Sequence, residues 1–175
     1  MNLGQHTVRA YDEQLTQLTQ LILEMGKEVR KMVLAARESF RSRDEARVTD
    51  AKIADKHINE LDEQIEDAAI VVLALQSPMA VDLRFVISVL KITGMLERAG
   101  DLAKNAIKRS VKMGPNTSED IIRRLEQMAD INVEMLDLAL QALEERDTPT
   151  STAVWRPPPA LAAPYPQTPT HTPPR

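Results

Sequence analysis

The feature that most constrains the fold is one long apolar stripe near the start of the chain, over residues 7–42. Its side chains recur alternately three and four residues apart, the spacing of one face of an α-helix. The stripe consists of Val8, Tyr11, Leu15, Leu18, Ile22, Met25, Val29, Met32, Ala36 and Phe40. An unbroken helix of this length spans roughly 50 Å. Such an element needs other long helices along it, so we predict an all-α fold.

Two further helices are predicted directly after the first. Asp44 is expected to cap a helix over residues 44–75, and Ser77 followed by Pro78 is typical of the start of a third helix. The third helix ends near Met113 and Gly114. The apolar seam of the second helix is Ala51, Ala54, Ile58, Leu61, Ile65, Ala68, Val72 and Leu75. Long helices with short links form an up-down-up antiparallel three-helix bundle.

A fourth helix is expected to begin at Thr117 or Ser118 and to repeat the pattern of the first. The two copies match at one constant offset: Met25, Met32, Ala36, Phe40 and Asp44 correspond to Met128, Met135, Ala139, Leu143 and Asp147. After this point the composition changes, because residues 148–175 hold nine of the eleven prolines. We predict three parts: a first bundle (1–114), the first helix of an incomplete second bundle (115–147) and a disordered Pro-rich tail (148–175).

Composition excludes several classes of protein. The chain has no cysteine, so it can form neither disulfides nor thiolate zinc sites. Its three histidines do not lie at ligand spacing, and its net charge of −4 argues against a nucleic-acid binder. No apolar run approaches the roughly 20 residues that span a bilayer, and the polar N-terminus does not resemble a signal peptide. These observations favour a soluble cytoplasmic protein.

Chemistry is concentrated where one face of the third helix changes from apolar to acidic, at Glu97 and Asp101. Asp55 lies 22 residues before Ser77 and Glu97 lies 20 after it, so antiparallel helices should place these two carboxylates at nearly the same level. Asp62 and Glu66 continue the acidic stripe of the second helix at the margin of this group. Converging carboxylates require protonation, basic partners or a metal ion.

Two interpretations of these carboxylates stay open at this point. In the first, Lys56, Arg98, Lys104 and Lys108 pair with them on a solvated surface. In the second they bind a metal ion, with Glu97, Asp101, Asp55 and Asp62 as the predicted ligands. Oxygen ligands of this kind suit magnesium, calcium, manganese or ferric iron. The Glu-x-x-His pairs of ferritin-like oxidases are absent from the sequence.

The same residues carry a family resemblance. The stretches QSPMAVDLR and LKITGMLERAGDLAKN on the third helix, and DKHINELDEQIEDA on the second, resemble the PhoU family of phosphate-uptake regulators. The specific part is Glu97-Arg98-Ala99-Gly100-Asp101, which is similar to the family's E-R-x-G-D metal-binding signature. The resemblance covers residues 7–147. It implies two tandem three-helix bundles with acidic clusters that bind iron, zinc or nickel.

The resemblance also implies a function and a departure from the family. It implies repression of the phosphate-starvation response, by bridging the sensor histidine kinase and the ATPase subunit of the phosphate-specific ABC transporter. Such proteins are regulators and not enzymes. The departure is that the family's second bundle continues with two more helices and a second E-R-x-G-D signature. Here the Pro-rich segment follows instead, as in a truncated or frameshifted reading of a longer protein.

We therefore expect a regulatory adaptor that acts through protein–protein contacts. The alternatives are a metal-dependent hydrolase and a purely structural helical module. We also expect a homodimer, because the apolar stripe of the fourth helix, which includes Leu136 and Leu140, would have no partner within its own chain. The alternative is that this helix frays.

Overall fold

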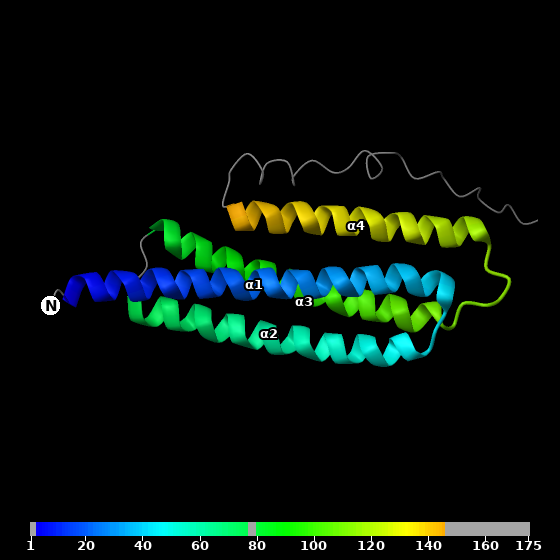
Figure 1. Ribbon diagram of the computed structural model, residues 1–175, viewed down its shortest axis with the longest axis horizontal. Coiled ribbons are helices and arrows are strands. Elements are labelled where there is room, and N and C mark those ends of the chain that lie inside the picture. Colours follow the sequence, from blue (N-terminus) through cyan, green and yellow to red (C-terminus); the bar gives the residue numbers. More distant parts are fainter. Residues whose placement is uncertain (1–2, 77–79, 146–175) are drawn as a thin grey trace, which may run out of the picture.

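The computed structural model describes residues 3–76 and 80–145. They form α1 (Leu3–Ser42), α2 (Ala46–Gln76), α3 (Ala80–Ser110) and α4 (Glu119–Glu145). The predicted all-α class is confirmed, and the four helices run alongside one another with α1 between α2 and α4 (Figure 1). Among these described helices, none is long and apolar enough to cross a membrane. The predicted cap at Ser77 and the Pro-rich segment 148–175 lie outside the described residues.

The link between α1 and α2 follows the predicted signals. Arg43 has a φ of 52°, the left-handed conformation that ends a helix, and its amide donates to the Ser39 carbonyl at 2.9 Å. The amide of Ala46 then donates to Asp44 Oδ1 at 2.9 Å, so Asp44 caps α2 as predicted. A side chain also caps the start of α4: the Ser118 hydroxyl accepts a hydrogen bond from the Asp120 amide at 3.3 Å.

The main core lies between α1, α2 and α3. From Leu15 onward, the whole predicted stripe of α1 is buried, and Leu18, Ile22, Met25 and Val29 are fully so. The α2 seam is confirmed in most positions, although Ala69 is buried where Ala68 was expected. At Gly100 a Cβ would lie 3.0 Å from Ile58 Cδ1. Because Gly100 has no side chain, α3 approaches α2 closely within the predicted signature itself.

The expectation that the fourth helix has no partner within its own chain is wrong. α4 packs antiparallel along α1 and buries Ile122, Ala129, Val133 and Ala142. Phe40 forms a small second core with Ile122 and Ala129, and Leu136 packs against the main core. Leu140 fits against Gly26, where a Cβ would lie 2.2 Å from Leu140 Cδ2. The spacing of an apolar stripe shows that a helix is packed but not which element it packs against, so this spacing alone could not assign α4 to α1.

Candidate functional site

The carboxylates of the predicted site are joined by a lysine. Lys104 Nζ lies 2.7 Å from Asp55 Oδ2 on α2 and 2.7 Å from Asp101 Oδ1, one turn away on α3. Asn105 Nδ2 donates to the other Asp101 oxygen at 3.1 Å. The Asp55 and Lys104 side chains are only 18% and 15% exposed. Lys104 thus links the two helices at a partly buried point, and it confirms one of the basic partners considered from sequence.

Hydrogen bonds and opposite charge stabilise the charged forms of Asp101 and Lys104. The hydrogen bond from Lys104 and its positive charge lower the pKa of Asp101. Burial by itself would lower the pKa of Lys104, but the hydrogen bonds to Asp101 and Asp55 outweigh burial, and the net pKa is raised. Asp101 and Lys104 therefore both remain ionised at neutral pH.

Glu97 does not lie level with Asp55 as predicted. Gly100 faces Ile58, and counting from this contact along antiparallel helices places Glu97 level with Leu61. Asp55 and Glu97 are then separated by about 9 Å along the bundle. The prediction took Ser77 as the midpoint of the link, whereas the observed contact puts the midpoint two residues later. In antiparallel helices, an error of one residue in the midpoint shifts the residue expected opposite Asp55 by two residues.

The predicted ligands therefore fall into two pairs. Asp55 and Asp101 share Lys104. Glu97 lies at the level of Leu61, one residue from Asp62, and the side chains of Glu97 and Asp62 are partly buried. Within residues 3–76 and 80–145, no three acidic or histidine side chains are grouped so that they could hold a metal ion. As arranged, the residues do not fit a multinuclear metal cluster, because the Lys104 ammonium already lies between the carboxylates of the first pair.

A second array of charges joins α1 to α4, and sequence reasoning missed it. Three arginines of α1 face acids of α4: Arg30 Nε lies 2.5 Å from Asp137, Arg37 Nε lies 2.6 Å from Asp130, and Arg41 Nη2 lies 3.0 Å from Glu126. The arginines are spaced by seven and four residues, and so are the acids in reverse order. These matching intervals of opposite charge were the signal that could have predicted an antiparallel α1–α4 pair.

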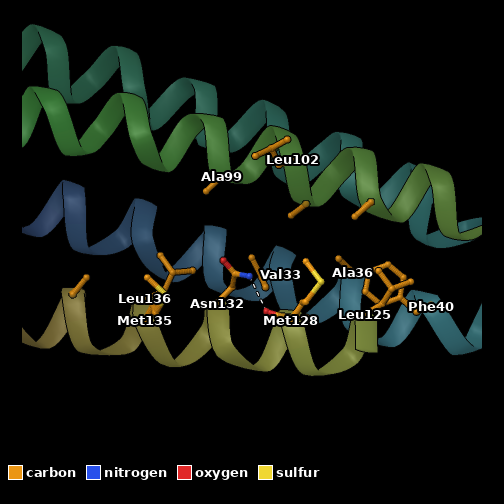
Figure 2. Close-up of a pocket in the computed structure, with 14 residues that line it drawn as sticks. Val33, Ala36, Phe40, Ala99, Leu102, Leu125, Met128, Asn132, Met135 and Leu136 are labelled. Carbon is orange, nitrogen blue, oxygen red and sulfur yellow. Dashed lines mark hydrogen bonds between the residues drawn. The ribbon is translucent and has the colours of Figure 1, made fainter. Parts of the chain in front are cut away.

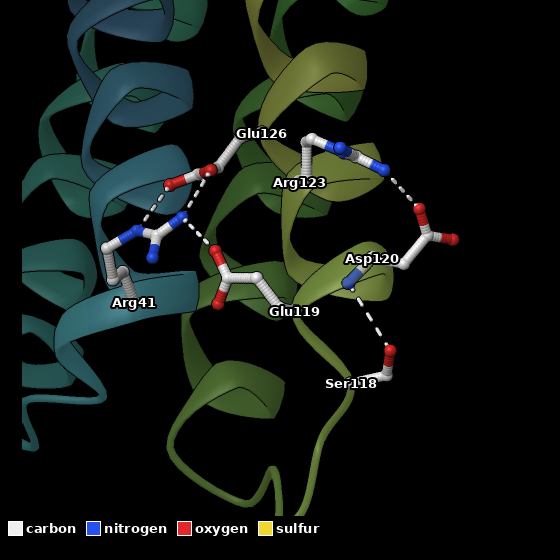
Figure 3. Close-up of polar contacts among 6 residues, drawn as sticks. All are labelled: Arg41, Ser118, Glu119, Asp120, Arg123 and Glu126. Atoms are coloured by element: carbon white, nitrogen blue, oxygen red, sulfur yellow. Dashed lines mark hydrogen bonds and ion pairs between the residues drawn. The ribbon is translucent and has the colours of Figure 1, made fainter.

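Arg41 forms the ion pairs of this array that lie nearest the start of α4. Its guanidinium donates to both oxygens of Glu126, at 3.1 and 3.0 Å, and to Glu119 at 2.9 Å (Figure 3). These hydrogen bonds raise the pKa of Arg41 and lower that of Glu126. Glu119 is the first residue of α4, where a carboxylate also interacts favourably with the helix dipole. Arg41 therefore orients the start of α4.

Comparisons with known proteins decide the family. The model of the PhoU domain matches residues 22–110. A relative from Caulobacter vibrioides, a "Phosphate-specific transport system accessory protein PhoU homolog", is 32% identical over 154 residues, 87% of this chain and 67% of the relative. The chain belongs to the PhoU family. A homolog of the same name from Rhizobium meliloti is 33% identical over 142 residues, covering 81% of this chain and 60% of the relative.

A third relative is also matched over part of its length. Serratia marcescens has a "Phosphate-specific transport system accessory protein PhoU" that is 24% identical over 156 residues, 89% of this chain and 64% of the relative. The chain thus spans 60–67% of the length of these curated relatives. All four predicted ligands lie inside the matched domain, and α4 lies after it. The structure therefore shows a PhoU domain with an additional helix packed along its first helix.

Proposed function

We propose that this chain is a regulatory accessory protein of phosphate transport, which represses phosphate uptake and phosphate-starvation signalling through protein–protein contacts. The observation that carries the proposal is membership of the PhoU family, whose relatives are named accessory proteins of the phosphate-specific transport system. The proposed partners are the ATPase subunit of the phosphate-specific ABC transporter and the sensor histidine kinase. Contact with these partners would take place in the cytoplasm.

The test is complementation of a bacterial strain that lacks its own phosphate transport accessory protein. We expect this chain to restore repression of a phosphate-starvation reporter at high phosphate, and to co-purify with the ATPase subunit or the kinase. A chain that is present at normal levels but restores no repression would overturn the proposal.

A non-enzymatic role is part of the same proposal. The relatives' names describe an accessory protein, and Lys104 forms ion pairs with two of the four carboxylates that a hydrolase would use. A phosphatase assay on protein incubated with divalent metals checks this point. Robust turnover that Glu97→Ala abolishes would instead establish the metal-dependent hydrolase.

Metal binding, by iron, zinc or another divalent cation, remains part of the proposal, with Asp55 and Asp101 as one pair of ligands and Glu97 and Asp62 as the other; a single ion would require the two pairs to move together. Since Lys104 Nζ lies between Asp55 and Asp101, metal and ammonium would compete for the same oxygens. Elemental analysis should find less metal in a Glu97→Gln, Asp101→Asn double variant and more in Lys104→Gln. Equal metal content in all three proteins would refute the assignment.

Self-association remains a prediction, although it was argued from an uncovered α4 and α4 packs on α1. Leu136 and Leu140 contact α1 and the main core of their own chain, so they cannot form the expected dimer interface. Sedimentation of the purified chain tests for a dimer directly.

A further inference from the structure

An apolar groove runs between α3 and α4, with α1 as its floor. Its volume is about 540 Å³, and Leu102, Leu125, Met128, Met135 and Leu136 are among the side chains that line it. Figure 2 shows Leu102 on one wall, Met128 and Met135 on the other, and Val33 and Ala36 of α1 behind them. The side chains of Leu102 and Met128 remain 61% and 51% exposed.

The shape of the groove fits a helix. On α4 it extends from Leu125 to Ala139, which is about 21 Å of helix. Alanines on all three helices, such as Ala36, Ala103 and Ala129, line the groove with small side chains, so the backbone of another element can approach closely. Exposed apolar side chains recur every seven residues along both helices, at Met95 and Leu102 on α3 and at Ile121, Met128 and Met135 on α4. Of these, Leu102, Met128 and Met135 line the groove. Apolar side chains also recur every seven residues along the face of a helix that packs against another helix.

The charges beside the groove favour one kind of helix. Lys91, Arg98 and Arg109 are exposed on α3. Lys91 lies eleven residues before Leu102, Arg98 four before it and Arg109 seven after it, so all three occupy the same face of α3 as this lining residue. A helix that enters the groove would pass along this basic row. An acidic flank on that helix would complement it and a basic flank would be repelled.

We propose that the α3–α4 groove is a docking site for one amphipathic helix of a partner protein, with an apolar ridge in the groove and an acidic flank along Lys91, Arg98 and Arg109. This inference rests on the proposed adaptor role and specifies the surface that the adaptor uses. Asn132 supplies the one polar group among the lining residues. Its Nδ2 donates to the Met128 carbonyl at 2.7 Å, which leaves its side-chain oxygen to accept from the bound helix.

The test uses the whole chain and two synthetic amphipathic peptides of about five helical turns. Both carry the same leucine ridge; one has glutamates on its flank and the other has lysines. Fluorescence anisotropy should show binding of the glutamate peptide with a dissociation constant on the order of 10 µM, as for a small interface. The lysine peptide should bind at least about tenfold more weakly.

Variants locate the binding surface. Leu102→Glu and Met128→Glu, on opposite walls, should each weaken binding of the glutamate peptide by about tenfold or more, and Arg98→Glu should remove the preference for the glutamate peptide. Ile70→Glu is the matched control, because Ile70 is 59% exposed on α2 and does not line the groove; it should bind as the unaltered chain does. Circular dichroism checks that each variant keeps its helices.

Three results would overturn the inference: neither peptide binds, both bind equally, or sedimentation shows a dimer that Met128→Glu dissociates. The last result would mean that a second copy covers the groove. The outcomes also separate this inference from the adaptor role. If the peptide fails to bind while the reporter is still repressed, the groove assignment alone is overturned. If the peptide binds while repression is absent, the role in phosphate transport is overturned.

Discussion

Lys104 is the residue on which the polar contact between α2 and α3 depends. Replacing it in Lys104→Met would leave Asp55, which is largely buried, close to Asp101 without a cation between them. We expect a loss of about 1–3 kcal/mol in the free energy of unfolding, measured by urea denaturation. The pKa of Asp101, now lowered by Lys104, should return towards its usual value. Lys56→Met is the control, because Lys56 is 80% exposed and its ion pair, with Glu60, lies within α2; it should change the unfolding free energy little.

Gly26 and Gly94 are both helical glycines, but they have different surroundings. A Cβ at Gly26 would lie 2.2 Å from Leu140 Cδ2, whereas a Cβ at Gly94 would meet nothing within 4 Å. Gly94→Ala should therefore stabilise the protein by up to about 1 kcal/mol, the gain in helix propensity. Gly26→Ala should lose that gain to crowding of about 1–3 kcal/mol against α4.

Thermal unfolding of the two variants measures this difference. The double variant Gly26→Ala, Leu140→Ala should be more stable than the sum of the two single changes, because it relieves the contact. If Gly26→Ala is as stabilising as Gly94→Ala, Leu140 is not seated on Gly26.

At the scale of elements, the α1–α4 pair depends on charges at matching intervals. In Arg37→Asp the new carboxylate would face Asp130, which now accepts from Arg37 at 2.6 Å. Like charges repel, so amide hydrogen exchange in α4 should become several-fold faster at low salt. The swap Arg37→Asp, Asp130→Arg should restore protection. Lys31→Asp alters a lysine whose ion pair, with Glu28, stays within α1, and should leave α4 unchanged.

The same pair should weaken in acid. Hydrogen bonding to Arg41 lowers the pKa of Glu126 below its ordinary value of 4.5. A lowered carboxyl pKa stabilises the folded state above that value, and the contribution is lost as the pH falls through the folded pKa. After correction for intrinsic rates, α4 amides should therefore be less protected at about pH 3 than at about pH 6. Glu126→Gln should make this pH dependence smaller, and an unchanged profile would contradict the role of Arg41.

Sequence periodicity predicted the elements better than their partners. The stripe of α1 and the caps at Asp44 and Ser118 are local features, so they could be read directly. The level of Glu97 relative to Asp55 could not, because it depends on the length of the link between α2 and α3. The seat of α4 on α1 depends on Gly26 and on three arginines that no local pattern singles out. Registers between helices are properties of two elements at once.

At the scale of the whole molecule, the four helices differ in how many neighbouring helices they pack against. α1, α2 and α3 each contact the other two and share the main core, whereas the substantial contacts of α4 are with α1 alone. Local stability follows such differences in packing. We predict two tiers in native-state hydrogen exchange, with α4 opening first and α1–α3 exchanging only on global unfolding.

Two core substitutions distinguish the tiers. Ile122→Ala removes apolar contact with Phe40 in the small second core, so it should lower the opening free energy of α4 by about 2–5 kcal/mol or abolish its protection, and leave α2 unchanged. Met25→Ala removes a fully buried side chain of the main core, and should lower the global tier by a similar amount. A single tier that both variants lower equally would mean that α4 and the PhoU bundle unfold as one cooperative unit, in which case the groove between α3 and α4 is as rigid as the core beneath it.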